Sequence, residues 1–210
     1  MLVAEKIASI KTKLAQLATR DPDTTTVTSA NCLGECLDEG QISHVEHQIG
    51  CRLPEDYRRF LAEVGNGGLG PGIGLTPLGA DSLIDPRIPV DGQFKLNPSA
   101  SFPYAGDWNF LPLKQALEEQ SPQLDELLVY YFDAARIDGT IHIADLGCGA
   151  IALLVLNGPQ RGRVWLDFRG TYGGIAPATL RHDDTDALDF LTWYDVWLGE
   201  SLTQSGPVAP

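Results

Sequence analysis

The residues that most clearly suggest chemistry lie in the stretch DLGCGA, where Asp145 precedes Gly147 and Gly149. A strand, a glycine-rich turn and a helix form the cofactor site of many S-adenosylmethionine-dependent methyltransferases, because glycines let a ligand approach the backbone closely. Asp167, about twenty residues further on, stands where such folds carry a ribose-binding acid. The pattern raises the hypothesis of a methyltransferase.

The segment after this turn lacks the pattern of the required helix. Ala150 opens an unbroken apolar run that ends at Asn157-Gly158-Pro159, whereas a helix packed on a sheet carries polar residues on its outer face. A short apolar run bounded by turns is typical of a buried strand. About sixty residues follow Gly149, too few for the remaining strand–helix units at ~30 residues each. The turn is predicted to join two strands, and the methyltransferase stays a remote alternative.

Two pairs of side chains are weighed as metal ligands. Cys32 and Cys36 have a spacing that a metal tolerates, but no Cys or His pair at a suitable distance follows them. His44 and His47 are three residues apart in an ordinary amphipathic helical pattern. Solvated or buried side chains explain both pairs, so we expect no metal site.

Cys148 and His142 could in principle act as a thiol nucleophile and its base. The simpler interpretation is a small thiol and a histidine with a structural environment. The sequence contains neither a Gly-x-Ser-x-Gly elbow nor a phosphate-binding loop ending in Gly-Lys-Ser or Gly-Lys-Thr. We therefore expect no catalytic residue, no cofactor and no enzymatic activity.

The composition indicates an acidic protein with a substantial core. The chain has 210 residues, 43% of them hydrophobic, and a formal charge of −13. Such a charge disfavours direct nucleic-acid binding and attracts a basic partner, although plain solubility explains it equally well. The beginning of the chain lacks the features of a signal peptide, and no apolar run could span a bilayer. We expect a cytoplasmic protein that does not bind membranes.

The chain is expected to form one main domain with an N-terminal arm. Residues 1–20 have the apolar period of an amphipathic helix, and the polar segment after them reads as a linker. We place the arm and linker at residues 1–37, the main domain at 38–200 and a disordered tail at 201–210.

Within the main domain, helical patterns come first and strand patterns later. Helices are expected at residues 41–49 and 54–64, the second opening at Pro54, where proline suits the first turn. A helical segment broken at Ser121-Pro122 follows, and a last helix begins near residue 184. Short strand-like pieces are expected at 75–78, 102–113, 140–147, 150–157, 162–170 and 173–177. This order predicts an α+β fold with a central, mostly antiparallel sheet packed by helices.

The ordered motifs of the main domain resemble those of the SUKH superfamily, which includes yeast Smi/Knr-type cell-wall regulators and many bacterial immunity proteins. The resemblance covers residues 38–200, and the order of the motifs is more specific than any one of them. The matching residues are Glu46, Leu53, Pro54, Tyr57, Asn66 to Gly68, Leu75, Pro77, Leu78, Gly147 to Gly149, Leu154, Val155, Gly158, Gly162, Val164, Trp165, Asp167, Phe190, Trp193, Tyr194 and Trp197.

The resemblance implies a non-enzymatic bacterial immunity protein that binds a toxin domain, often a nuclease or deaminase, and blocks it. In such proteins the Gly-Cys-Gly turn joins strands and binds no cofactor. A basic substrate groove on the toxin would suit the acidic charge of this chain. The alternative in another class is a scaffold or regulator that binds a housekeeping partner.

A surface near the sheet edge is the candidate for partner binding, because aromatic residues anchor interfaces and acids suit a basic partner. The opposing interpretation is that Trp108 and Tyr172 only pack within the core or its loops. The candidate residues are Asp107, Trp108, Asp138, Asp167 and Tyr172.

Overall fold

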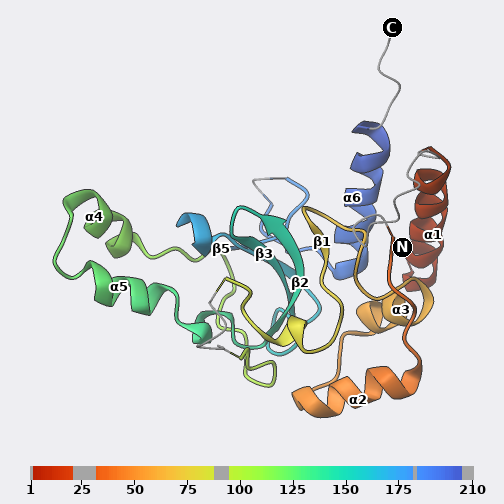
Figure 1. Ribbon diagram of the computed structural model, residues 1–210, viewed down its shortest axis with the longest axis horizontal. Helices are drawn as coiled ribbons and strands as arrows, with labels where there is room; N and C mark the ends of the chain where they lie inside the picture. Colours follow the sequence, from red (N-terminus) through yellow and green to blue (C-terminus); the bar gives the residue numbers. More distant parts are fainter. Residues whose placement is uncertain (1, 21–31, 88–94, 182–183, 205–210) are drawn as a thin grey trace, which may run out of the picture.

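A five-stranded antiparallel sheet lies at the centre of the computed structural model (Figure 1). The structure describes residues 2–20, 32–87, 95–181 and 184–204. Neighbouring strands in the chain are neighbours in the sheet, in the order β1-β2-β3-β4-β5. Their bounds are Gly74–Leu75 for β1, Thr140–Gly147 for β2, Ala150–Val155 for β3, Val164–Asp167 for β4 and Ile175–Pro177 for β5. The expected α+β fold with an antiparallel sheet is confirmed.

The sheet is covered on both faces, which explains its continuous apolar runs. Every residue of β3 is buried, as expected of a strand with a core on each side. Ala152 and Leu154 face a cluster that includes the helices, whereas Ile151, Leu153 and Val155 face a second cluster. Loop residues such as Leu96 and Phe102 cover that second face.

Helices α1 (Val3–Arg20), α2 (Glu39–Ile49), α3 (Glu55–Glu63) and α6 (Phe190–Gln204) contribute to the first core cluster. Asp38 and Gln41 form a reciprocal capping box at the start of α2, and Gly50 ends that helix in the left-handed conformation. Edge-to-face rings of α3 and α6 meet in the core, with Phe60 4.9 Å from Phe190. The helices expected from the apolar period therefore occur, although α6 begins at Phe190, later than the pattern indicated.

Helix α1 packs directly on α6. Ile7 and Ile10 belong to the main core cluster. Lys6 Nζ donates to Asp189 Oδ2 at 2.7 Å, and Lys13 Nζ lies 2.8 Å from Asp195 Oδ1. The segment expected to be an arm thus contributes apolar and ionic contacts to the body. Helix α6 continues to Gln204, beyond residue 200 where we ended the domain, and residues 205–210 of the expected tail lie outside the described ones.

The Gly-Cys-Gly turn joins β2 to β3. Gly147, Cys148 and Gly149 all have positive φ, at 82°, 52° and 76°, which glycine adopts at low cost. The segment that follows is a strand antiparallel to β2, with Ile141 opposite Leu154. A methyltransferase site needs a helix at this point, so the structure contradicts that alternative.

Two expected strands differ in the structure. The piece at 75–78 reduces to the two-residue β1, and Leu78 is buried in a turn after it. In the piece at 102–113, residues 102–110 are a loop that makes one isolated bridge, between Trp108 and Ile175 of β5, and residues 111–113 begin the next helix. The proline and glycine residues of these segments limit backbone pairing with a neighbouring strand. The alternation of apolar and polar side chains in the sequence does not show where such pairing stops.

A helical hairpin projects from the end of the molecule opposite α1 and α6 (Figure 1). It consists of α4 (Leu111–Glu119) and α5 (Leu124–Tyr131), separated near Ser121-Pro122 as the sequence predicted. Short 3-10 segments lie at Asp81–Leu83 (η1), Ala134–Ile137 (η3) and Arg169–Thr171 (η4). Within the described residues, none of the helices has the length and apolar character needed to cross a membrane.

Candidate partner-binding surface

Trp108 is attached to the edge strand of the sheet. Its backbone N–H donates to Ile175 O at 2.8 Å, and Ile175 N–H donates back to Trp108 O at 2.7 Å. The half-buried indole stacks on Tyr104 and Tyr131, with ring centroids 5.5 and 5.4 Å apart. Packing against two rings fixes the indole and leaves part of it open to solvent.

Tyr172 lies beside this stack. It follows η4 with φ of 61°, a left-handed conformation that is uncommon for a non-glycine residue. Its ring centroid is 6.3 Å from that of Tyr131, and its carbonyl accepts a hydrogen bond from Asn109 Nδ2 at 3.3 Å. The side chain is 46% exposed. The structure thus places the rings of Trp108 and Tyr172 next to that of Tyr131.

A close approach of two backbones holds this arrangement. Gly174 has φ of 81°, and a Cβ on it would lie 2.2 Å from Trp108 O. Its N–H donates to the Tyr131 hydroxyl at 2.9 Å. A larger residue at position 174 would force the loop at Trp108 away from β5.

Asp167 is not available to a partner. It is 0% exposed, and its carboxylate accepts hydrogen bonds from Arg169 Nη2 and Arg87 Nη2, each at 2.8 Å. Arg87 also contacts Asp85 at 2.6 Å. We call Asp85, Arg87, Asp167 and Arg169 the buried charge network. The prediction of Asp167 as a surface contact is therefore corrected. Asp167 is the last residue of β4, and its side chain lies on a buried face of the sheet.

Electrostatics within the network favour the charged form of Asp167. Burial alone would raise the pKa of its carboxyl, but hydrogen bonds from Arg169 and Arg87 outweigh burial and hold the pKa below its ordinary value. Arg169 also donates from Nη1 to the carbonyls of Tyr131 and Asp133, at 3.0 and 3.1 Å. The network therefore connects β4 and η4 to the end of α5.

The two remaining acids lie on separate segments. Asp107 is exposed and precedes Trp108 in the chain. Asp138 follows η3 and is half-buried, and burial together with the nearby charge of Asp133 raises the pKa of its carboxyl. The following residue, Gly139, donates its N–H to Asn97 O at 2.9 Å, so Asp138 lies where η3 meets the loop that covers the sheet.

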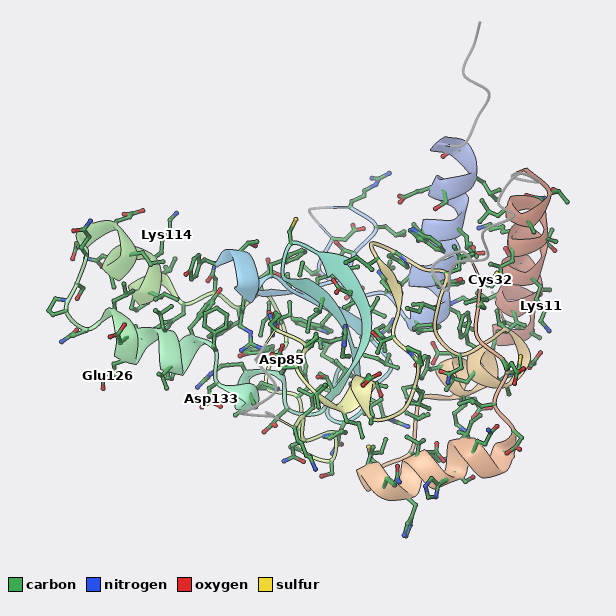
Figure 2. All side chains as sticks on the ribbon, viewed as in Figure 1. Lys11, Cys32, Asp85, Lys114, Glu126 and Asp133 are labelled. Atoms are coloured by element: carbon green, nitrogen blue, oxygen red, sulfur yellow. The ribbon has the colours of Figure 1, made fainter. Side chains whose placement is uncertain are left out.

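Several aromatic and apolar residues near this surface were not singled out from the sequence. Tyr130 and Phe110 join the two helices of the hairpin at its base, with ring centroids 4.7 Å apart. The Arg136 guanidinium lies 4.1 Å from the Tyr130 ring centroid and 5.8 Å from that of Trp108. Figure 2 shows Asp133 at the base of the hairpin, with Lys114 and Glu126 further out. The apolar run LLVYY in α5 is the sequence feature that could have identified these residues.

The side chains considered for chemistry lie apart. Cys148 is exposed on its turn, whereas His142 is buried on β2 with its ring 3.4 Å from the Thr76 hydroxyl. Burial lowers the pKa of His142. Cys32 and Cys36 are both exposed free thiols. Across the described residues, no group of three or more His, Cys, Asp and Glu side chains could hold a metal ion.

Comparison with known proteins gives one match. The model of the SMI1 / KNR4 family (SUKH-1) matches residues 36–187, which extend from just before α2 to the loop that precedes α6. No curated protein and no solved structure matches the chain. The matched range includes the sheet, the buried charge network and the α4–α5 hairpin.

Proposed function

The chain belongs to the SMI1 / KNR4 family (SUKH-1), and on this basis we propose that it is a bacterial immunity protein that binds and neutralises a toxin domain. The observation that carries the proposal is the family match, which covers more than half of the chain. Members of this family generally bind protein partners and generally carry out no chemistry themselves. Inhibition by this chain then depends on occupying the partner's surface.

The charge of the chain supports a basic partner. A formal charge of −13 attracts a cationic surface over long distances and speeds the encounter. A nuclease carries such a surface because its substrate is polyanionic. The acidic chain would occupy the substrate groove and exclude the nucleic acid sterically and electrostatically. The protein acts in the cytoplasm in this proposal, where the toxin would meet its target.

The proposed contact surface combines aromatic anchors with acids. Trp108 and Tyr172 supply rings held by packing, which lose little side-chain freedom on binding. Asp107 and Asp138 supply carboxylates toward a basic partner. Asp167 has no contact role because it is buried; it holds the strand end through Arg169 and Arg87.

The first experiment is a tagged pull-down from the native host, washed at low and at moderate salt, with bound proteins identified by mass spectrometry. One stoichiometric partner with a basic domain is expected, and co-expression of this chain should rescue cells that produce that domain. Loss of the partner at higher salt would measure the electrostatic contribution. The absence of any stoichiometric partner, or a captured domain that is harmless to cells, would contradict the immunity role.

The contact surface is tested with the captured partner. Replacing Asp107 and Asp138 by Lys and Tyr172 by Ala should weaken binding at least about tenfold, because the acids then repel the basic partner and one anchor is lost. Glu35→Lys with Glu200→Lys is the control, since both residues are exposed on other segments. Equal affinities for the two variants would show that the contact surface lies elsewhere.

A scaffold or regulatory role is the second candidate, because the family match supports this type of protein as well. A scaffold would capture several housekeeping proteins by weaker contacts and would not rescue poisoned cells. The same pull-down distinguishes the two roles by the number and stoichiometry of the captured proteins.

A further inference from the structure

Helix α5 is strongly apolar but is hardly buried. Among its eight residues, only Asp125 and Glu126 are charged, and the rest are Leu, Val or Tyr. Tyr131 is the only one of the eight that is buried. A helix that is apolar on nearly all sides is normally covered by other elements. Among the described elements, the one that packs extensively on α5 is α4, a helix of nine residues.

The exposed apolar surface of the chain is concentrated on this hairpin. Seven large hydrophobic residues are exposed in the described part of the chain, and four of them belong to the hairpin or adjoin it. Leu111 is 71% exposed and Val129 75%, and Tyr130 and Tyr172 are 43% and 46% exposed. Leu111 begins α4 and Val129 lies near the end of α5, so in an antiparallel pair both are at the base of the hairpin. We call Leu111, Val129 and Tyr130 the hairpin patch.

The hairpin that carries the patch is acidic. Residues 107–138 contain seven acidic and two basic residues, a formal charge of −5. Glu118 and Glu119 are exposed at the end of α4, and Asp125 and Glu126 at the start of α5. These four acids lie at the tip of the hairpin, where α4 ends and α5 begins, and the patch lies at its base. An exposed apolar patch marks an interaction site, and the net negative charge of the hairpin favours a cationic occupant.

The charge also decides against two other occupants. A second copy of this chain would place one acidic hairpin on another, and like charges in an interface are costly. A segment of the same chain outside the described residues would have to be basic to complement the acidic hairpin. Residues 21–31, 88–94 and 205–210 contain neither Lys nor Arg.

We infer that the α4–α5 hairpin is a docking arm for a basic amphipathic helix of the partner protein, with the hairpin patch on the helix's apolar side. Side-chain ridges of one helix pack between those of another, so an exposed apolar helical face can receive a third helix. The partner's Leu-type side chains would cover Leu111, Val129 and Tyr130, and its Lys or Arg side chains would pair with the acids of α4. This inference rests on the proposed partner-binding function and names the element and the chemistry of the contact.

The test uses the full chain and a synthetic helical peptide with Leu on one face and Lys on the other, titrated calorimetrically at low salt. A one-to-one complex is expected. Leu111→Ser with Val129→Ser should weaken it roughly tenfold or more, because these side chains would fill the apolar contact. Ile73→Ser with Leu180→Ser is the matched control, since both side chains are exposed elsewhere, and should stay within about twofold.

Two double variants with the same change in net charge separate local from long-range electrostatic attraction. Glu118→Lys with Glu119→Lys changes the last turn of α4, where cations are compatible with the helix dipole, and should weaken peptide binding about tenfold or more. Glu35→Lys with Glu200→Lys changes the net charge equally at exposed sites on other segments and should have a smaller effect. Thermal unfolding of each variant checks that the fold is retained.

Three results would overturn the inference: no peptide binding, equal loss in hairpin and control variants, or self-association of the wild-type chain that the Leu111→Ser/Val129→Ser variant abolishes. The last would assign the patch to a second copy. Rescue of poisoned cells is measured independently. If the chain rescues poisoned cells but does not bind the peptide, the docking arm is wrong and the immunity function stands. If the chain binds the peptide but no toxin is found, the docking arm stands and the immunity function is wrong.

Discussion

Asp167 shows how a single side chain links the sheet to the candidate surface. Its carboxylate compensates the buried guanidinium of Arg169, which in turn holds the carbonyls of Tyr131 and Asp133. Removing one partner of a buried ion pair leaves an uncompensated charge, which costs more than the pair itself contributes. The network therefore affects both stability and the position of the aromatic residues.

Asp167→Ala should lower the free energy of unfolding by about 3–5 kcal/mol, since Arg169 would remain buried with Asp85 as its nearest described carboxylate at 3.8 Å. Urea unfolding followed by tryptophan fluorescence measures this change. Asp107→Ala, at an exposed position, should stay within ~0.5 kcal/mol. Similar values for the two variants would mean that the network contributes little to stability.

Asp167 also predicts a direction for the pH dependence. Its pKa is lower in the folded chain than the ordinary value of about 3.9, so its stabilising contribution is present above about pH 4 and is lost as pH falls through the folded pKa. Asp167→Asn should flatten the stability profile below about pH 4. Urea midpoints measured across this range, with Asp107→Asn as control, check the prediction; parallel profiles for wild type and Asp167→Asn would contradict it.

Among the elements, α1 is the one whose role is least apparent from the family match. It precedes the matched residues 36–187, yet Ile7 and Ile10 lie in the main core and Lys6 bonds Asp189 at the start of α6. Helix α6 begins beyond residue 187 as well. The two helices therefore complete a core that the matched segment forms only in part.

Ile10→Ala should destabilise the whole chain by about 2–5 kcal/mol, because it leaves a cavity at a fully buried position. Calorimetry should show a single transition at lower temperature, since α1 shares the main core. Lys11→Ala, with a half-exposed side chain, is the control and should change little. An unchanged main transition preceded by a separate small one would mean that α1 unfolds as an independent arm.

At the scale of the whole molecule, charge and shape act together. The apolar and acidic hairpin projects at one end, and α1, α3 and α6 pack at the other (Figure 1). The formal charge of −13 acts over the entire surface, whereas the hairpin patch acts only on contact. Long-range charge governs how fast a partner arrives, and local packing governs how long it stays.

The association rate with the captured partner should fall roughly tenfold or more between about 0.1 M and 1 M salt, as the screening length shrinks from ~10 Å to ~3 Å. The dissociation rate should change less. Stopped-flow or surface-based kinetics measure both rates. Glu35→Lys with Glu200→Lys, which lowers the net negative charge, should slow association at low salt only. A salt-independent association rate would show that charge does not steer the encounter.

The sequence by itself determined the elements whose signal is local. Apolar period, proline and glycine positions placed α1, α2, α3 and the break between α4 and α5, because helix formation and turn chemistry depend on near neighbours. The same signals predicted that the Gly-Cys-Gly turn joins two strands, and the pairing of β2 with β3 confirms this. The ordered motifs likewise indicated the family, and the family match confirms it.

Only the tertiary structure decided which side chains meet. Burial of Asp167 depends on Arg87 and Arg169, and the first of these is eighty residues away in the chain. Trp108 and Tyr172 come together because the loop pairs with β5. Helix α5 is exposed because, among the described elements, only α4 packs on it extensively. Contacts between distant segments are set by the packing of the whole chain, and no local pattern contains that information.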